Sequence, residues 1–134
     1  MINTIDDIKP KLLIVEDDFD NQRFLEFLLK SSFELVVCDS GEKMYQVLET
    51  NRYDVFLMDI SLKGKKNGLQ LIQELRQLEE YKNTPIICLT AHAFIKDREN
   101  AINAGADVFL IKPVPNRTLI DSIYEVINSK AKRN

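Results

Sequence analysis

Short continuous runs of aliphatic residues alternate along the chain with segments of helical spacing. A continuous apolar run, unlike an alternating one, is typical of a strand that is buried on both faces of a parallel sheet. Repeated strand–helix units of this kind predict an α/β fold with right-handed crossovers. The predicted strands are Lys11–Val15, Glu34–Cys38, Asp54–Met58, Pro85–Leu89 and Asp107–Ile111.

Apolar residues three or four positions apart predict a helix after each of these runs. The helix near Phe94–Ala104 is the most polar, so we expect a weakly anchored helix that is suited to movement. Ser40-Gly41 should open the second helix, and Gly105 should close the fourth. The apolar residues are Phe24, Leu25 and Leu28; Met44, Val47 and Leu48; Leu71, Ile72, Leu75 and Leu78; Ala101, Ile102 and Ala104; and Leu119, Ile123, Val126 and Ile127.

The number of strand–helix units decides between a closed and an open sheet. A closed barrel needs about eight units, and the chain has five such runs. We therefore predict a doubly wound, five-stranded parallel sheet of the flavodoxin-like (βα)5 type, in the order 2-1-3-4-5. Ligands bind such sheets beyond the carboxyl ends of the strands, where the strand order reverses.

Acidic, hydroxyl and amine side chains collect at these predicted strand ends. Carboxylates that converge without a cation repel one another, and some are forced to take up protons. Because every candidate ligand is an oxygen, a hard ion such as Mg²⁺ or Mn²⁺ fits better than zinc. The residues are Glu16, Asp17 and Asp18 after the first strand, Asp59 after the third, Thr90 after the fourth, and Lys112 and Pro113 after the fifth.

This set of side chains suits phosphoryl transfer. A carboxylate such as Asp59 can act as a nucleophile and form an aspartyl phosphate. A divalent ion would neutralise phosphoryl oxygens during in-line transfer. Lys112 could place a charge beside one oxygen, and Thr90 could donate a hydrogen bond to another.

Composition narrows the class of protein. The 134 residues are 45% hydrophobic and 29% charged, which is typical of one soluble globular domain. The net charge of −3 gives no indication of a nucleic-acid surface. Cys38 and Cys88 lie within apolar runs and are expected to be buried thiols. Residues 1–10 do not form a signal peptide and no run is long enough to span a membrane, so a cytoplasmic location is expected.

Four motifs in this order resemble the receiver domain of two-component response regulators. The resemblance extends from residue 11 to about residue 128. It rests on the joint placement of the motifs at the ends of the correct strands, since each is weak by itself. The matching segments are Leu12–Asp18, Asp54–Ile60, Ile86–Ala91 and Phe109–Pro113.

The resemblance implies a role for each residue of the site. Asp59 would be the phospho-acceptor, and Asp17 a direct ligand of the metal ion. Glu16 would bind the metal directly or through water, and Ser61 would offer its backbone carbonyl. Lys112 would be the lysine that the family uses at this position, followed by a cis bond to Pro113.

The resemblance also implies a switch. On phosphorylation, the hydroxyl of Thr90 would move toward the phosphoryl group, and Phe109 would rotate into the vacated space. The surface of the fourth helix, fifth strand and fifth helix would then change, as a shift between two populations. The phosphoryl donor would be a sensor histidine kinase or a histidine phosphotransfer protein, and the switch would act on a downstream target protein.

Several of these residues have simpler interpretations. Asp18 is more readily explained as a helix-leading acid than as a ligand. Thr90 and Ser61 could satisfy backbone groups in turns. His92 could overhang the site, although we favour a solvated histidine, and the small Ala91 would leave room for a phosphodonor.

The loop Ser61–Gly68 departs from the family pattern. It lacks a common proline, is about one residue longer than usual, and carries Lys63, Lys65 and Lys66. A solvated loop is the preferred interpretation. The alternative is that these lysines recruit an acidic partner or a phosphate donor.

We expect a stand-alone receiver domain over residues 11–130, preceded by an extension of residues 1–10 and without an output domain. It would catalyse its own phosphorylation and dephosphorylation, and would be a monomer or a phosphorylation-dependent homodimer. The alternatives are a receiver-like binding module that acts without phosphorylation, and an intermediate receiver of a phosphorelay. A haloacid dehalogenase-type hydrolase is disfavoured, because the first strand lacks the Asp-x-Asp motif of that class.

Overall fold

Parallel strand pairing organises the chain. In the computed structural model, which describes residues 8–91 and 94–133, the strands form one sheet in the order β2-β1-β3-β4-β5. This confirms the predicted doubly wound topology and strand order. The strands are β1 (Lys11–Val15), β2 (Glu34–Cys38), β3 (Val55–Asp59), β4 (Ile86–Thr90) and β5 (Val108–Ile111).

Three strands begin one residue later than predicted, and the reason is clearest at two aspartates. The carboxylate of Asp54 accepts a hydrogen bond from the Lys11 backbone N–H at 2.7 Å. The carboxylate of Asp107 accepts one from the Ile86 backbone N–H at 2.9 Å. These side chains occupy backbone donors at the edge where the strands begin. Each aspartate therefore stands directly before its strand, which begins at the next residue.

A helix follows each strand, as predicted. Ser40 caps α2 and Gly105 ends α4 with a positive φ of 122°, as expected for a glycine at that position. Asn67 caps α3 in a capping box with Gln70, and Asp18 caps α1. The helices are α1 (Phe19–Leu29), α2 (Gly41–Thr50), α3 (Gly68–Gln77), α4 (Ile95–Ala104) and α5 (Asn116–Arg133).

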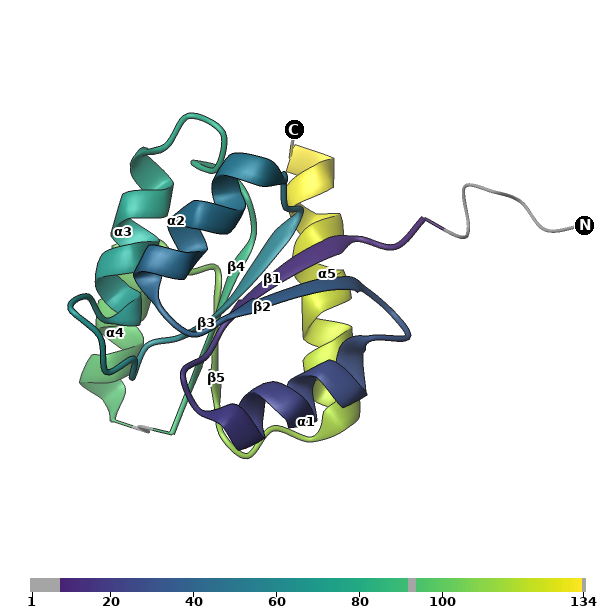
Figure 1. Ribbon diagram of the computed structural model, residues 1–134, viewed down its shortest axis with the longest axis horizontal. Coiled ribbons are helices and arrows are strands. Elements are labelled where there is room, and N and C mark those ends of the chain that lie inside the picture. The colour runs from purple at the N-terminus through teal and green to yellow at the C-terminus, as the bar shows by residue number, and fades with distance from the viewer. Residues whose placement is uncertain (1–7, 92–93, 134) are drawn as a thin grey trace, which may run out of the picture.

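The helices cover both faces of the sheet. Figure 1 shows α1 and α5 on one side, with α2, α3 and α4 on the other. The side chains of β3 and β4 are buried throughout, whereas the edge strands β2 and β5 are only partly covered. The prediction of strands buried on both faces therefore holds for the centre of the sheet and is wrong at its edges.

Three apolar residues that had been assigned to helix cores are exposed, and one of them is Ile102 of α4. Phe24 is 52% exposed, and the core contacts of α1 come from Leu25 and Leu29, which lie four positions apart on one face. Leu78 is 38% exposed because it caps the end of α3 and lies outside the helix. Spacing alone does not distinguish the residue that faces the sheet from its neighbour.

Both cysteines are free and buried, as predicted. Burial raises the pKa of the Cys38 thiol to about 12 and that of the Cys88 thiol to about 12. Neither thiol is therefore a reactive group at neutral pH.

Arg76 ties together the edge at which β4 and β5 begin. Its guanidinium donates to the carbonyl oxygens of Gly105 at 2.9 Å, Tyr81 at 3.0 Å and Thr84 at 2.6 Å. It also pairs with the carboxylate of Asp107 at 2.9 Å. A single side chain of α3 thus holds both the α3–β4 loop and the turn after α4.

Replacing Arg76 with methionine should destabilise the protein by about 3 kcal/mol, because the apolar stem is kept while several part-buried acceptors lose their charged donor. Urea unfolding followed by circular dichroism measures this change. Arg117→Ala is the control, since Arg117 is 84% exposed and, among the residues that the structure describes, forms an ion pair only with Asp121 on its own helix. That variant should stay within about 0.5 kcal/mol of the parent. Equal losses in the two variants would refute the role given to Arg76.

Candidate functional site

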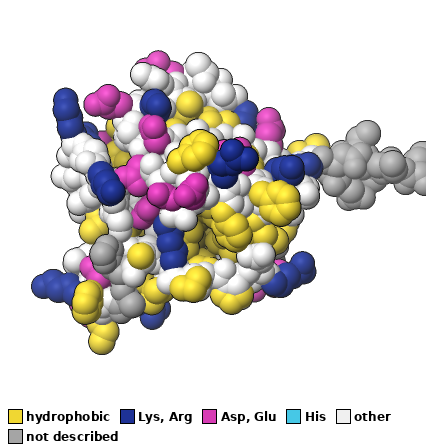
Figure 2. Space-filling view, turned by 60° about the horizontal axis from the view of Figure 1, so that its bottom comes forward, with side chains coloured by type: hydrophobic (Ala, Val, Ile, Leu, Met, Phe, Trp, Pro, Cys, Tyr) yellow, Lys and Arg dark blue, Asp and Glu magenta, His cyan; other side chains and the backbone are white. Residues whose placement is uncertain are grey.

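Carboxylates from two neighbouring strands meet where the strand order reverses. Glu16 and Asp17 follow β1, Asp59 ends β3, and one carboxylate oxygen of each lies within 4.8 Å of the others. The strands end at the lower side of Figure 1, and Figure 2 turns that side forward. Figure 2 shows acidic side chains gathered near the middle of this face, with basic side chains around them and hydrophobic ones to one side.

Glu16 is almost fully buried and uses both of its oxygens. Oε1 accepts a hydrogen bond from the Lys112 ammonium at 2.8 Å, and Oε2 accepts one from the Asp18 backbone N–H at 3.2 Å. Burial raises the pKa of Glu16, the hydrogen bond from Lys112 lowers it, and the neighbouring Asp59 raises it again. The result is a pKa above the usual value of a glutamate.

Lys112 bridges two of the acids. Its ammonium lies 2.8 Å from Glu16 Oε1 and 3.4 Å from Asp59 Oδ2. Burial by itself would lower the pKa of Lys112, but the hydrogen bond to Glu16 and the charges of both acids raise it above its ordinary value. The backbone N–H of Lys112 donates to the Thr90 carbonyl at 2.7 Å, and its bond to Pro113 is cis, the isomer that the resemblance implies.

Asp59 is 7% exposed and is held by the backbone that follows it. Its Oδ1 accepts a hydrogen bond from the Ser61 N–H at 2.8 Å. The Ser61 hydroxyl lies 3.4 Å from the hydroxyl of the buried Thr90, at the end of the neighbouring strand. The ends of β3 and β4 thus bring a carboxylate and two hydroxyls to one place.

Asp17 contacts the loop after β3. Its Oδ2 accepts a hydrogen bond from the Lys63 backbone N–H at 2.9 Å. Asp18, by contrast, caps α1 by accepting from the Asn21 N–H at 2.9 Å, which agrees with its interpretation as a helix-leading acid. The two neighbouring aspartates therefore have different surroundings.

Gly68 is a residue of the site that the sequence did not single out. A Cβ atom at this position would lie 2.4 Å from the Asp59 carbonyl oxygen and 2.5 Å from the Ile60 Cα. No side chain fits against backbone at such distances. The start of α3 can therefore pack directly behind Asp59 only with glycine there, and this requirement could not be seen from spacing.

The remaining predicted residues lie around this centre. Phe109 is half-buried and packs against the core on the side of α3 and α4. Ala91 is exposed directly after β4. His92 lies outside the described residues.

The donor set fits a hard divalent ion. Three carboxylates offer oxygens within 4.8 Å of one another, and Lys112 neutralises only part of their charge. Mg²⁺ is commonly held by one or two carboxylates together with water and phosphate oxygens. The same place presents the Asp59 carboxylate beside an ammonium and two hydroxyls.

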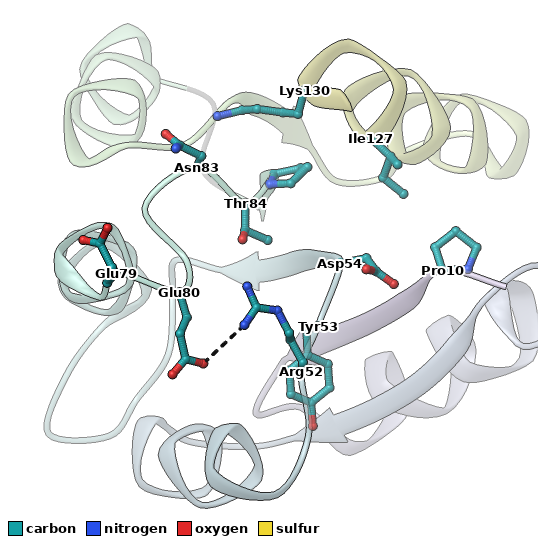
Figure 3. A pocket seen from close by; sticks show the side chains of 11 residues that line it. Pro10, Arg52, Tyr53, Asp54, Glu79, Glu80, Asn83, Thr84, Ile127 and Lys130 are labelled. Carbon is teal, nitrogen blue, oxygen red and sulfur yellow. Dashed lines mark ion pairs between the residues drawn. The ribbon is translucent and has the colours of Figure 1, made fainter. Parts of the chain in front are cut away.

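A second hollow lies at the opposite edge of the sheet, where the strands begin. Figure 3 shows Arg52 and Glu80 facing one another there, with an ion pair at 3.9 Å. Lys130, also in this hollow, pairs with Asp107 at 3.1 Å. The hollow's other charged groups are engaged with residues outside it, Glu79 with Lys82 and Asp54 with the Lys11 backbone N–H, and it lies at the other end of the strands from the acids of the site.

A model of the response regulator receiver domain matches residues 12–124. The chain belongs to this family. As a receiver domain, it is 35% identical over 118 residues to the transcriptional regulatory protein CpxR of Klebsiella pneumoniae, which covers 87% of this chain and 49% of that protein. It is 32% identical over 131 residues to the hybrid signal transduction histidine kinase I of Dictyostelium discoideum, covering 92% of this chain and 7% of the kinase.

Solved structures agree with this receiver fold. The receiver domain of the sensor histidine kinase PA1611 from Pseudomonas aeruginosa has a TM-score of 0.82 and 33% identity, covering 90% of this chain and 99% of that one. That crystal structure has a magnesium ion coordinated in its active site cleft. A CheY-like receiver from Methanospirillum hungatei has a TM-score of 0.85 at 24% identity, covering 95% and 100%, and shows the fold alone.

The receiver domain spans about half the length of CpxR and a small part of the hybrid kinase. The match therefore concerns the receiver domains of those longer proteins and not their whole activities. Among the described residues, no helix is both long and apolar enough to cross a membrane.

Gly68→Ala should destabilise the receiver domain by about 2 kcal/mol, because the methyl group would push α3 away from the backbone of Asp59. Gly64→Ala is a matched control, since a Cβ there meets nothing within 4 Å. Thermal and urea unfolding of the two variants compare them directly. Equal stabilities of the two variants would show that the backbone behind Asp59 yields easily.

Proposed function

We propose that this receiver domain is a signalling switch that accepts a phosphoryl group on Asp59. The observation that carries the proposal is the placement of Asp59, buried at the end of β3, within reach of Lys112 and among the carboxylates of Glu16 and Asp17. A carboxylate that was simply part of the core would not be surrounded by further acids. The family to which the chain belongs supports the same assignment.

Each neighbour has a separate task in this proposal. One oxygen of Asp59 forms a bond to phosphorus while the phosphorus–nitrogen bond of a phosphohistidine breaks. The electron pair of that bond remains on the imidazole, which takes up a proton. Lys112 offsets negative charge on one phosphoryl oxygen, and the Thr90 hydroxyl donates to another.

Asp17, Asp59 and the Ser61 carbonyl are the proposed direct ligands of Mg²⁺, with Mn²⁺ as a substitute. When bound, the ion supplies positive charge to the phosphoryl oxygens. Glu16 is assigned contact through water, because both of its oxygens already accept hydrogen bonds, from Lys112 and from Asp18. The magnesium ion in the PA1611 receiver structure supports this choice of metal.

The output is a change in the surface of α4, β5 and α5. Thr90 moves toward the phosphoryl group, and Phe109 rotates into the space left behind. Half-buried Phe109 on β5 is paired in register with Cys88 on β4, the strand that ends in Thr90. A downstream target protein, or a second copy of the domain, would recognise the altered surface in the cytoplasm.

The donor is proposed to be a sensor histidine kinase or a histidine phosphotransfer protein. The receiver domain, over residues 11–130, would catalyse its own phosphorylation and the later hydrolysis. A second role, as an intermediate receiver of a phosphorelay, is supported by similarity to a hybrid kinase and to the receiver of a sensor kinase. Transfer of label from the phosphorylated domain to a phosphotransfer protein would distinguish that role.

Incubation with Mg²⁺ and acetyl phosphate should add the mass of one phosphoryl group, and Asp59→Asn should abolish the addition because an amide is not a nucleophile. Intact mass spectrometry before and after mild base measures the adduct, since an acyl phosphate is base-labile. Asp18→Asn is the matched control, because asparagine also caps a helix. No adduct from any donor, with Mg²⁺ bound, would favour the binding module. Continuous release of phosphate from many organic phosphates would favour a hydrolase.

Asp17→Asn should weaken Mg²⁺ binding by at least about tenfold, because a charged ligand is replaced by a neutral one of the same shape. Isothermal titration calorimetry with Mg²⁺ provides the affinity, and Asp18→Asn again serves for comparison. An unchanged affinity in Asp17→Asn would remove Asp17 from the ligand set.

A further inference from the structure

The loop Ser61–Asn67, between β3 and α3, forms the rim of the site. Its first part is fixed, because Leu62 is 7% exposed and the Lys63 backbone N–H donates to Asp17 Oδ2 at 2.9 Å. Residues 63–67 are exposed. The hydrogen bond to Asp17 places the backbone of Lys63 against an acid of the site.

The three lysines of this loop have different surroundings. The ammonium of Lys66 lies 2.7 Å from Glu74 Oε2 and over the ring of Tyr45, whose hydroxyl donates to the same carboxylate. Lys66 lowers the pKa of Glu74, with Tyr45 acting in the same direction. Lys66 therefore fastens the loop to α3 and α2.

Lys63 and Lys65 are not engaged in this way. Within residues 8–91 and 94–133, neither side chain forms an ion pair. Between them, Gly64 has open space around its Cα. The fastened ends of the loop thus hold two unpaired positive charges at the rim of the site.

The net charge of the site indicates what these two lysines could do. The carboxylates of Glu16, Asp17 and Asp59 are accompanied by a single contacting ammonium, that of Lys112, among the described residues. Lys112 and a divalent ion together offset these three carboxylates, so the loaded site presents no net positive charge to an approaching anion. Positive charge at the rim therefore supplies an attraction for anionic phosphodonors that the centre of the site lacks.

We propose that Lys63 and Lys65 attract small dianionic acyl phosphates to Asp59, and so determine how fast this receiver domain is charged by them. The inference rests on the proposed function of Asp59. In the step concerned, an Asp59 oxygen bonds to phosphorus and the phosphorus–oxygen bond to the acyl group breaks. The carboxylate leaves with the electron pair, and no proton is needed. Lys66 has no part in the attraction.

The test compares Lys63→Gln/Lys65→Gln with the parent in phosphorylation by acetyl phosphate and Mg²⁺. At an ionic strength of about 0.01 M, where the screening length is about 30 Å, the double variant should be slower by about threefold or more. At about 1 M the screening length is about 3 Å, and the two rates should converge. Phosphoramidate, which carries less net negative charge, should show a smaller difference. Intact mass spectrometry follows the adduct on Asp59.

Two control proteins separate a local effect from a change in net charge. Arg52→Gln/Lys82→Gln removes two positive charges beside the loops at the opposite edge of the sheet, in and near the hollow of Figure 3, and should match the parent. Lys66→Gln removes one charge from the loop and should retain the parent's salt dependence. An equal slowing in the Arg52 and Lys82 variant would overturn the proposal.

The Mg²⁺ affinity of the double variant should not fall together with its phosphorylation rate. Loss of two positive charges near the acids should leave Mg²⁺ binding unchanged or tighter by calorimetry, while phosphorylation slows. Weaker Mg²⁺ binding that accounts for the slower rate would refute the steering role, as would equal rates at low salt or a difference that persists at high salt.

If the parent protein forms no adduct on Asp59 with any donor, the proposed function fails and this inference fails with it. If the parent is phosphorylated and the double variant keeps pace, the inference alone fails.

Discussion

Mutual repulsion among buried carboxylates is the constraint on which the site depends. Glu16, Asp17 and Asp59 bring oxygens within 4.8 Å of one another, and two of these side chains are almost fully buried. Lys112 relieves part of the repulsion by contacting both buried acids, while burial, and after it the neighbouring Asp59, still raise the pKa of Glu16. Such a cluster favours a bound cation, and this is what the proposed phosphoryl transfer to Asp59 requires.

Backbone geometry keeps these acids together. Parallel strands end at one edge, so residues that follow β1 and β3 become neighbours although they are far apart in sequence. Gly68 then lets α3 approach the backbone of Asp59 more closely than any other residue would allow. Asp59 ends β3 at the centre of the sheet, where β3 and β4 are buried throughout, whereas β5, the strand of the proposed switch surface, is only partly buried.

The strand order and the meeting of Glu16, Asp17 and Asp59 could be predicted, because both follow from the number of strand–helix units and from which residues end the strands. The burial of the edge strands and of Phe24, Leu78 and Ile102 was misjudged, since an apolar pattern does not say how much of a surface the neighbouring elements cover. The contact of Lys63 with Asp17 and the close approach at Gly68 depend on the path of a loop. No pattern of residue types in the sequence encodes that path.

The two ends of α4 are held very differently, and this determines where a signal can act. At its end, Gly105 is fixed by the Arg76 guanidinium, and the Ala106 N–H donates to the Ala101 carbonyl at 3.0 Å. At its start, Phe94 provides no side-chain cap, and Phe94 and Ile95 are 74% and 79% exposed. We therefore expect the proposed displacement of Thr90, on the strand that precedes α4, to meet less resistance at the start of the helix than at its end. The expected motion is a pivot about Gly105 that carries the exposed apolar residues at the start of α4 with it.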